Sequence, residues 1–98
     1  MSFVITKEEE GTAVVTLGGE LDLSNIAPVE AAVADVIQAH PRHLVVDVSR
    51  LQFADSSAIA LWLRWAASVD KMELRNVPPL LKHVIASMGL RESLGLRR

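Results

Sequence analysis

Residues 43–67, HLVVDVSRLQFADSSAIALWLRWAA, decide the fold of this chain. Within them Leu44-Val45-Val46 is a short continuous apolar run, which is typical of a central strand covered on at least one face. Residues 49–53 are then expected to form a connecting loop. Three helix-capping residues, Asp55-Ser56-Ser57, precede a largely apolar stretch from Ala58 to Ala67, so a helix is predicted there.

The residues before this stretch predict a hairpin and a helix. Phe3–Lys7 and Thr12–Leu17 are predicted strands, joined by a charged turn into an antiparallel pair. Gly18-Gly19 is expected to end the second strand. Apolar residues then recur at spacings of three and four, which predicts one face of a helix that ends before Pro41. These residues are Ile26, Val29, Val33, Val36 and Ile37.

The residues after this stretch predict one more strand and a last helix. Met72–Val77 is the strand, Pro78-Pro79 begins the helix, and Gly89 is placed to end it in the left-handed conformation. The order is therefore β-β-α-β-α-β-α. Right-handed crossovers then predict an α/β sandwich, with helices packed along one face of a mixed four- to five-stranded sheet.

Composition limits the classes of function. The 98 residues, half of them hydrophobic, suit a single domain spanning residues 1–98 with one modest core. A net charge of −2 argues against nucleic acid as a partner. No apolar run is long enough to span a bilayer, and the first ten residues are acidic where a signal peptide would be basic and apolar. The expected location is therefore the cytoplasm, without membrane insertion.

The sequence contains few of the motifs that catalysis or metal binding would require. The chain has no cysteine, which removes thiolate metal sites and cysteine nucleophiles. No G-x-S-x-G motif surrounds a serine, and His40, His43 and His83 lack the paired spacing of metal ligands. We therefore expect no catalytic residue, no metal and no cofactor.

Asp55-Ser56-Ser57 admits two interpretations. A helix needs only one capping side chain, and any of the three would serve. A serine at a helix N-terminus is also a favourable acceptor for phosphate, because the helix dipole and free backbone N–H groups stabilise an anion there. The residues alone leave open a simple cap and a phosphorylation switch.

The helix after this cluster carries two apolar stripes. One contains Ile59, Trp62, Leu63 and Ala66, and the other contains Leu61, Trp65 and Ser68. A helix on a single sheet buries one stripe fully, so Leu61 and Trp65 are expected to stay partly exposed and to contact a partner. The alternative is that neighbouring helices cover both stripes.

Four short motifs together resemble the sulfate-transporter and anti-sigma antagonist (STAS) domain. They are Gly19-Glu20-Leu21-Asp22, Leu44-Val45-Val46-Asp47, Phe53-Ala54-Asp55-Ser56-Ser57 and Met88-Gly89-Leu90. Their order and spacing match the family over almost the whole chain.

The resemblance implies a function. Small members of the family resemble bacterial anti-anti-sigma factors, which bind a serine-kinase anti-sigma factor and so release a sigma factor for transcription. Ser56 would be the phosphoacceptor, a serine phosphatase would restore the binding form, and Asp55 and Ser57 would shape the site. Asp22, with Ser24 in the same loop, would meet the kinase. The chain itself would catalyse nothing.

Two features depart from this pattern. Many antagonists continue D-S-S-G-L-G, whereas Ala58 and Ala60 here place methyl groups where a partner's backbone is expected. The run Asp55-Ser56-Ser57-Ala58 before a leucine-rich helix, together with Asn76-Val77-Pro78 after the last strand, also resembles another STAS branch. Its members are small cytoplasmic subunits of lipid-trafficking ABC transporters, which bind the transporter's ATPase. The partner is thus an anti-sigma kinase or, alternatively, that ATPase.

Overall fold

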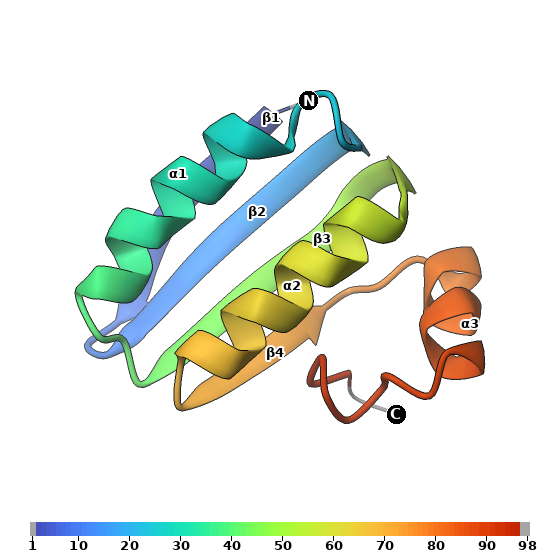
Figure 1. Cartoon of the computed structure of the whole chain (residues 1–98). Coiled ribbons are helices and arrows are strands. Elements are labelled where there is room, and N and C mark those ends of the chain that lie inside the picture. The colour runs from blue at the N-terminus through green and yellow to red at the C-terminus, as the bar shows by residue number, and fades with distance from the viewer. Residues whose placement is uncertain (1, 97–98) are drawn as a thin grey trace.

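The chain alternates strands and helices as the sequence predicts, in a computed structural model that describes residues 2–96 and leaves out the side chains of residues 7–9 (Figure 1). The elements are β1 (Ser2–Glu9), β2 (Thr12–Leu21), α1 (Ile26–Gln38), β3 (His43–Ala54), α2 (Ser56–Ser68), β4 (Lys71–Arg75) and α3 (Pro79–Ser87).

The strands form one mixed sheet in the order β1-β2-β3-β4. β1 is antiparallel to β2, whereas β3 is parallel to both β2 and β4. The predicted mixed sheet is confirmed, with four strands. α1 and α2 lie side by side over one face of it, and α3 lies beyond β4, past the edge of that helical layer (Figure 1).

β2 and β3 are longer than the sequence suggested. Gly18-Gly19 does not end β2, and residues 49–53 are not a loop, because the two strands continue to pair as far as Leu21 and Ala54. The register shifts twice along this extension, as β-bulges do. Glycine at position 18 lets the neighbouring strands approach closely, because a Cβ there would lie 3.1 Å from the Ser2 hydroxyl oxygen.

The core lies between the sheet and the layer of α1 and α2. Alternate residues of the strands face it, as the strand period requires. Its fully buried members include Leu17, Leu21, Val33, Leu44, Val46, Leu61, Trp62 and Leu74. None of the helices in residues 2–96 is long and apolar enough to cross a membrane.

The opposite face of the sheet carries charged side chains. Glu73 is only 5% exposed, and its Oε2 accepts a hydrogen bond from Arg75 Nε at 3.0 Å. Asp47 accepts from the Ser49 backbone N–H at 2.9 Å and from Asn76 Nδ2 at 3.2 Å. Partial burial works to raise the pKa of Asp47, but these hydrogen bonds and the Arg75 charge outweigh it and hold the pKa below its usual 3.8.

The residues after α3 close the β4 edge. Gly89 ends α3 in the left-handed conformation, and the N–H of Leu90 donates to the Ile85 carbonyl at 3.1 Å, which confirms the predicted cap. The buried side chain of Leu94 then anchors the segment, and the N–H of Leu74 donates to the Gly95 carbonyl at 3.3 Å. An otherwise open strand edge is thereby covered.

The Asp47 interactions predict a pH dependence. A carboxyl whose pKa is lowered by folding contributes stability above its unfolded pKa and loses it as the pH falls. Asp47→Asn should therefore be less stable than the parent at pH 7, and the difference should shrink between about pH 4 and pH 2. Urea unfolding across this range measures it, with Asp35→Asn, on the exposed side of α1, as control. A difference that stays constant with pH would contradict the prediction.

Gly95 predicts a sharp stability effect. Its φ is +68°, and an added Cβ would lie 2.0 Å from the Met72 carbonyl oxygen. Gly95→Ala should cost about 2–4 kcal/mol, from the left-handed backbone together with the overlap. Gly89→Ala is the matched control, because its φ is +73° and no atom lies within 4 Å, so it should cost about 1–2 kcal/mol. Equal losses in urea unfolding would show that the contact with Met72 does not matter.

Candidate functional site

Two of the predicted site segments, the loop that begins at Asp22 and Asp55-Ser56-Ser57, meet where β2 and β3 end. The two strands are parallel, so the loop after β2 and the N-terminus of α2 leave the sheet at the same edge. The N–H of Asp55 donates to the Leu21 carbonyl at 3.2 Å, and the N–H of Leu23 donates to Asp55 Oδ2 at 3.4 Å. The structure therefore joins the Asp22 loop to Asp55-Ser56-Ser57.

Asp55 alone provides the cap of α2. Its backbone is extended, and its Oδ1 accepts hydrogen bonds from the N–H groups of Ser57 at 2.9 Å and Ala58 at 3.3 Å. Ser56 is the first residue of the helix, is exposed, and hydrogen-bonds through its hydroxyl to none of residues 2–96. Its hydroxyl is thus not needed to begin the helix.

The loop from Asp22 to Asn25 is held by its own side chains. Asn25 Nδ2 donates to the Glu20 carbonyl at 2.8 Å, and Asn25 Oδ1 accepts from the Asp22 N–H at 3.0 Å. Asp22 Oδ1 accepts from the hydroxyl and, at 2.9 Å, from the backbone N–H of Ser24. The bonds from the Ser24 hydroxyl and then from the Ser24 N–H lower the pKa of Asp22.

Asn25 is a site residue that sequence reasoning did not identify. It directly precedes α1, but its side chain makes no capping bond to that helix and instead fixes the loop. An Asn three residues after an Asp at a strand end is a signal for such a turn.

Three residues that the sequence predicted as partner contacts do not lie at the surface. Ala58 and Leu61 are fully buried and Trp65 is 3% exposed. α1 packs beside α2 on the same face of the sheet, and Arg64 Nη2 on α2 bonds to Glu30 Oε2 on α1 at 3.0 Å. Ile59 and Trp62 of one stripe and Leu61 and Trp65 of the other are therefore all buried, which is the alternative that the sequence left open.

Exposed apolar residues do flank the site, at other positions. Leu23 in the loop is 74% exposed, and Phe53, just before Asp55, is 52% exposed. Of the two alanines that replace glycines, Ala58 directs its methyl group into the core and Ala60 is exposed. Only the Ala60 methyl group therefore lies at the surface.

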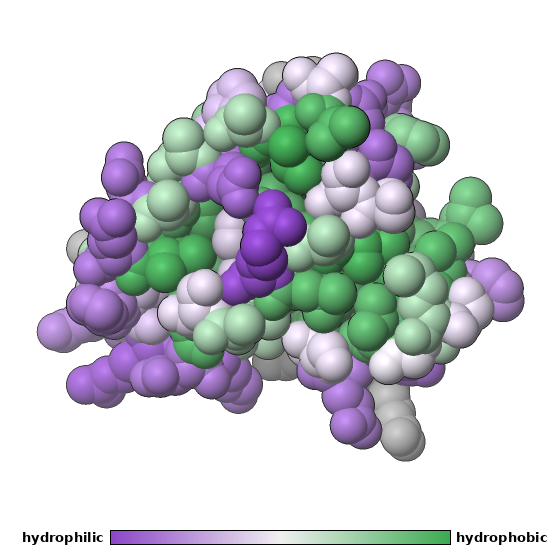
Figure 2. Space-filling view, in the orientation of Figure 1, coloured by the Kyte–Doolittle hydropathy of each residue, from purple (hydrophilic) through white to green (hydrophobic). Residues whose placement is uncertain are grey.

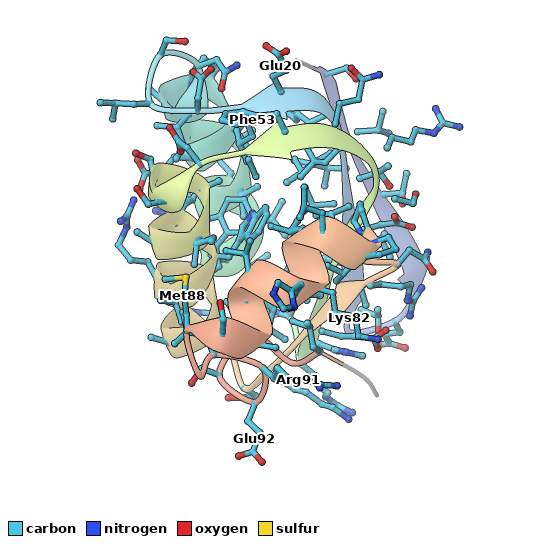
Figure 3. All side chains as sticks on the ribbon, turned by 90° about the vertical axis from the view of Figure 1, so that its right-hand side faces the viewer. Glu20, Phe53, Lys82, Met88, Arg91 and Glu92 are labelled. Carbon is cyan, nitrogen blue, oxygen red and sulfur yellow. The ribbon has the colours of Figure 1, made fainter. Side chains whose placement is uncertain are left out.

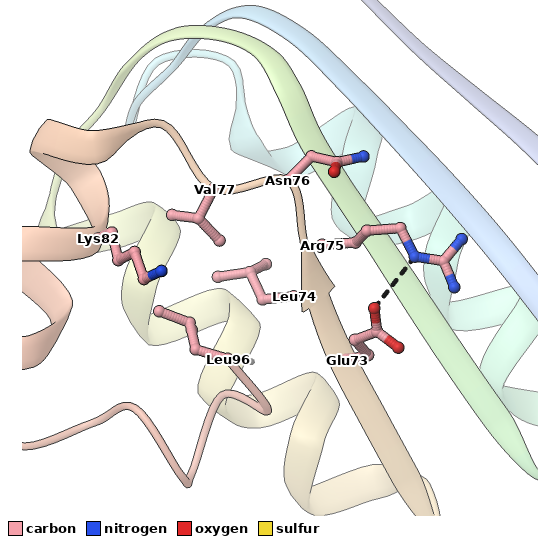
Figure 4. Close-up of a pocket in the computed structure, with 7 residues that line it drawn as sticks. All are labelled: Glu73, Leu74, Arg75, Asn76, Val77, Lys82 and Leu96. Atoms are coloured by element: carbon pink, nitrogen blue, oxygen red, sulfur yellow. Dashed lines mark hydrogen bonds and ion pairs between the residues drawn. The ribbon is translucent and has the colours of Figure 1, made fainter. Parts of the chain in front are cut away.

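A hollow on another part of the surface contains none of the predicted site residues. It measures about 420 Å³ and lies between α3, β4 and the C-terminal segment (Figure 4). Lys82 points into it beside Leu74 and Leu96, whereas the Glu73–Arg75 pair points away (Figure 4). Among the side chains that the structure describes, no group of three or more His, Asp or Glu is placed to hold a metal ion.

Comparisons with known sequences point to one family. A family model described as "Mlab, STAS domain" matches residues 5–97. Over 58 residues the chain is 34% identical to the anti-sigma-F factor antagonist RsfB of Mycobacterium tuberculosis, an alignment that covers 59% of this chain and 48% of RsfB. The chain thus spans about half the length of the curated relatives it matches.

Solved structures share the fold over nearly the whole chain. An anti-sigma factor antagonist from Mycobacterium paratuberculosis superposes with a TM-score of 0.87 at 21% identity, covering 97% of this chain and 83% of that one. The Bacillus cell fate determinant SpoIIAA in its phosphorylated form gives a TM-score of 0.79 at 25% identity, covering 98% and 89%. Its unphosphorylated form gives 0.82 at 24%, covering 98% and 86%.

The role of Asp55 is testable by unfolding. Asp55→Ala removes the cap and the bond to Leu23, and should cost about 1–2 kcal/mol. Asp55→Ser retains one capping oxygen and should lose less than half of that. Urea unfolding of the two variants checks the order, and a Ser56→Ala variant should match the parent. If Ser56→Ala were the more damaging change, Ser56 and not Asp55 would support the helix.

Proposed function

The chain belongs to the STAS domain family, and from this premise we propose that it is an anti-sigma factor antagonist switched by reversible phosphorylation of Ser56. Its partners are then a serine-kinase anti-sigma factor and a serine phosphatase, and the regulated process is sigma-dependent transcription. The observation that carries the proposal is the exposed Ser56 hydroxyl at a helix N-terminus whose cap Asp55 already supplies.

The charge around Ser56 explains how a phosphate would act. The N–H groups of Ser57 and Ala58 already bond to Asp55 Oδ1, so a phosphate on Ser56 meets occupied donors and an adjacent carboxylate. Its charge of about −2 would therefore face solvent or a bound protein. Phosphorylation would change the surface that a partner meets and leave the packed core as it is.

The surroundings of Ser56 provide the contact surface for the kinase. Asp22 and Ser24 lie in the loop that Asp55 holds, and Ser57 lies beside the phosphoacceptor. Ala58, Leu61 and Trp65 take no part, because they are buried. In this role the chain is a substrate and a binding partner and performs no catalysis of its own.

A second candidate is a STAS subunit of a lipid-trafficking ABC transporter, which would bind the transporter's ATPase. The feature in its favour is Asn76-Val77-Pro78 after β4, where Asn76 adopts a φ of +59° and turns the chain toward α3. In that role Ser56 would simply be the first residue of a capped helix, and its charge would not control binding.

Charge substitution at Ser56 separates the two candidates. Tagged parent and Ser56→Asp proteins are purified from the native host, and the bound proteins are identified by mass spectrometry. An anti-sigma kinase should be recovered with the parent and at least tenfold less with Ser56→Asp, while the melting temperature stays within about 2 °C because the side chain is exposed.

Ser56→Ala provides the matched control for that experiment. It should bind the kinase like the parent and accept no phosphate from it. Equal kinase recovery by the parent and Ser56→Asp would contradict the switch. Recovery of an ABC ATPase with both forms would instead support the transporter role.

A further inference from the structure

Exposed apolar side chains gather on one side of the molecule. Six large hydrophobic residues are exposed in the described part of the chain, and four of them form what we name the α3 patch. Its members are Phe53 (52% exposed), Leu80 (77%), Val84 (39%) and Met88 (50%). Figure 2 shows this apolar surface over α3, and Figure 3 views it face on, with Phe53 above α3 and Met88 at its far end.

A groove runs through the α3 patch. It measures about 280 Å³, and its walls are the last residues of β3, from Leu51 to Ala54, and the side chains of Pro78, Leu80, Leu81 and Val84. This volume lies just below the range of about 300–1,000 Å³ that small-molecule sites occupy. A groove of this size and apolar lining suits one large side chain from another protein better than a cofactor.

The position of α3 accounts for the exposure. Of the large apolar residues from Leu80 to Met88, only Ile85 is fully buried. α3 lies beyond β4 and not over the sheet, so the remaining apolar residues have no layer to cover them (Figure 1). A contiguous exposed apolar surface of this kind is typical of a contact site for another protein.

The groove lies within reach of any protein that encloses Ser56. A standard interface buries about 800 Å² on each partner, equivalent to a disc of about 16 Å radius. Phe53 precedes Ser56 by three residues, so their Cα atoms are at most about 11 Å apart. A kinase centred on the Ser56 hydroxyl would therefore reach Phe53, which lines the groove.

We propose that the groove between β3 and α3 is a second anchor for the kinase that phosphorylates Ser56, and that it receives a large aliphatic or aromatic side chain from the kinase surface. This inference rests on the proposed function and adds to it. Desolvated pockets that hold one large side chain provide much of the affinity of many interfaces. The phosphoacceptor would then supply the switch, while the groove supplies affinity that does not depend on phosphate.

Kinetics of Ser56 phosphorylation test the anchor. The probe is the purified serine-kinase anti-sigma factor of the same organism, with ATP, acting on the parent, Leu80→Gln and Phe53→Ser. Both substitutions affect exposed side chains, so the fold should persist, as circular dichroism and melting would verify. We expect kcat/KM to fall about tenfold through a higher KM with kcat unchanged, because the anchor contributes equally before and during phosphate transfer.

Val4→Gln provides the matched control. Val4 is 58% exposed on β1 and lies outside the α3 patch. Ser56 of Val4→Gln should therefore be phosphorylated with the same kcat/KM as Ser56 of the parent. If the kinase phosphorylates Ser56 of Leu80→Gln and Phe53→Ser with the same kcat/KM as Ser56 of the parent, the anchor is wrong and the proposed function stands. A loss in Val4→Gln equal to that in the two groove variants would also overturn the anchor. A kinase that leaves Ser56 of the parent unmodified would overturn the proposed function and the anchor together.

Discussion

Parallel pairing of β2 with β3 is the constraint on which the rest of the structure depends. Two parallel strands cannot be joined by a tight turn, so α1 must cross over one face of the sheet between them. Their carboxyl ends then coincide, and each continues directly into a polar segment. The hydrogen bond from the Asp55 N–H to the Leu21 carbonyl extends this pairing beyond the strands themselves. The site is therefore a consequence of topology, assembled from segments more than 30 residues apart.

Asp55 connects this topology with the chemistry of the site. One carboxylate oxygen satisfies the first N–H groups of α2, and the other reaches the N–H of Leu23 in the neighbouring loop. A helix N-terminus leaves several backbone donors without partners, so a single acidic residue can meet this need. Ser56, which follows Asp55, is therefore not needed to cap the helix. The fold requires only one of the three capping residues.

The sequence predicted what depends on local pattern and was less successful where distant segments meet. The order of elements, the mixed sheet and the cap at Gly89 were all apparent from periodicity and residue type. Gly18-Gly19 was interpreted as a stop because glycine usually breaks a strand, but a neighbouring strand paired through it with bulges. Trp65 was expected at the surface because helix periodicity takes account of the sheet alone, whereas α1 covers the second stripe of α2. The α3 patch was not foreseen, because its exposure depends on where α3 lies relative to β4.

The same arrangement separates the residues that stabilise the fold from the proposed site of modification. The large apolar side chains of α2 point into the core, whereas Ser56 lies exposed in its first turn and its hydroxyl bonds to none of the side chains or backbone groups that the structure describes. A modification there changes the surface charge without removing a packing contact or a cap. Sites that are altered reversibly need this separation, because a domain with only 5–15 kcal/mol of stability has little margin for unfolding at each modification. Substitutions of exposed residues at the carboxyl ends of the strands can thus change which partner this fold binds, while the pairing of β2 with β3 stays the same.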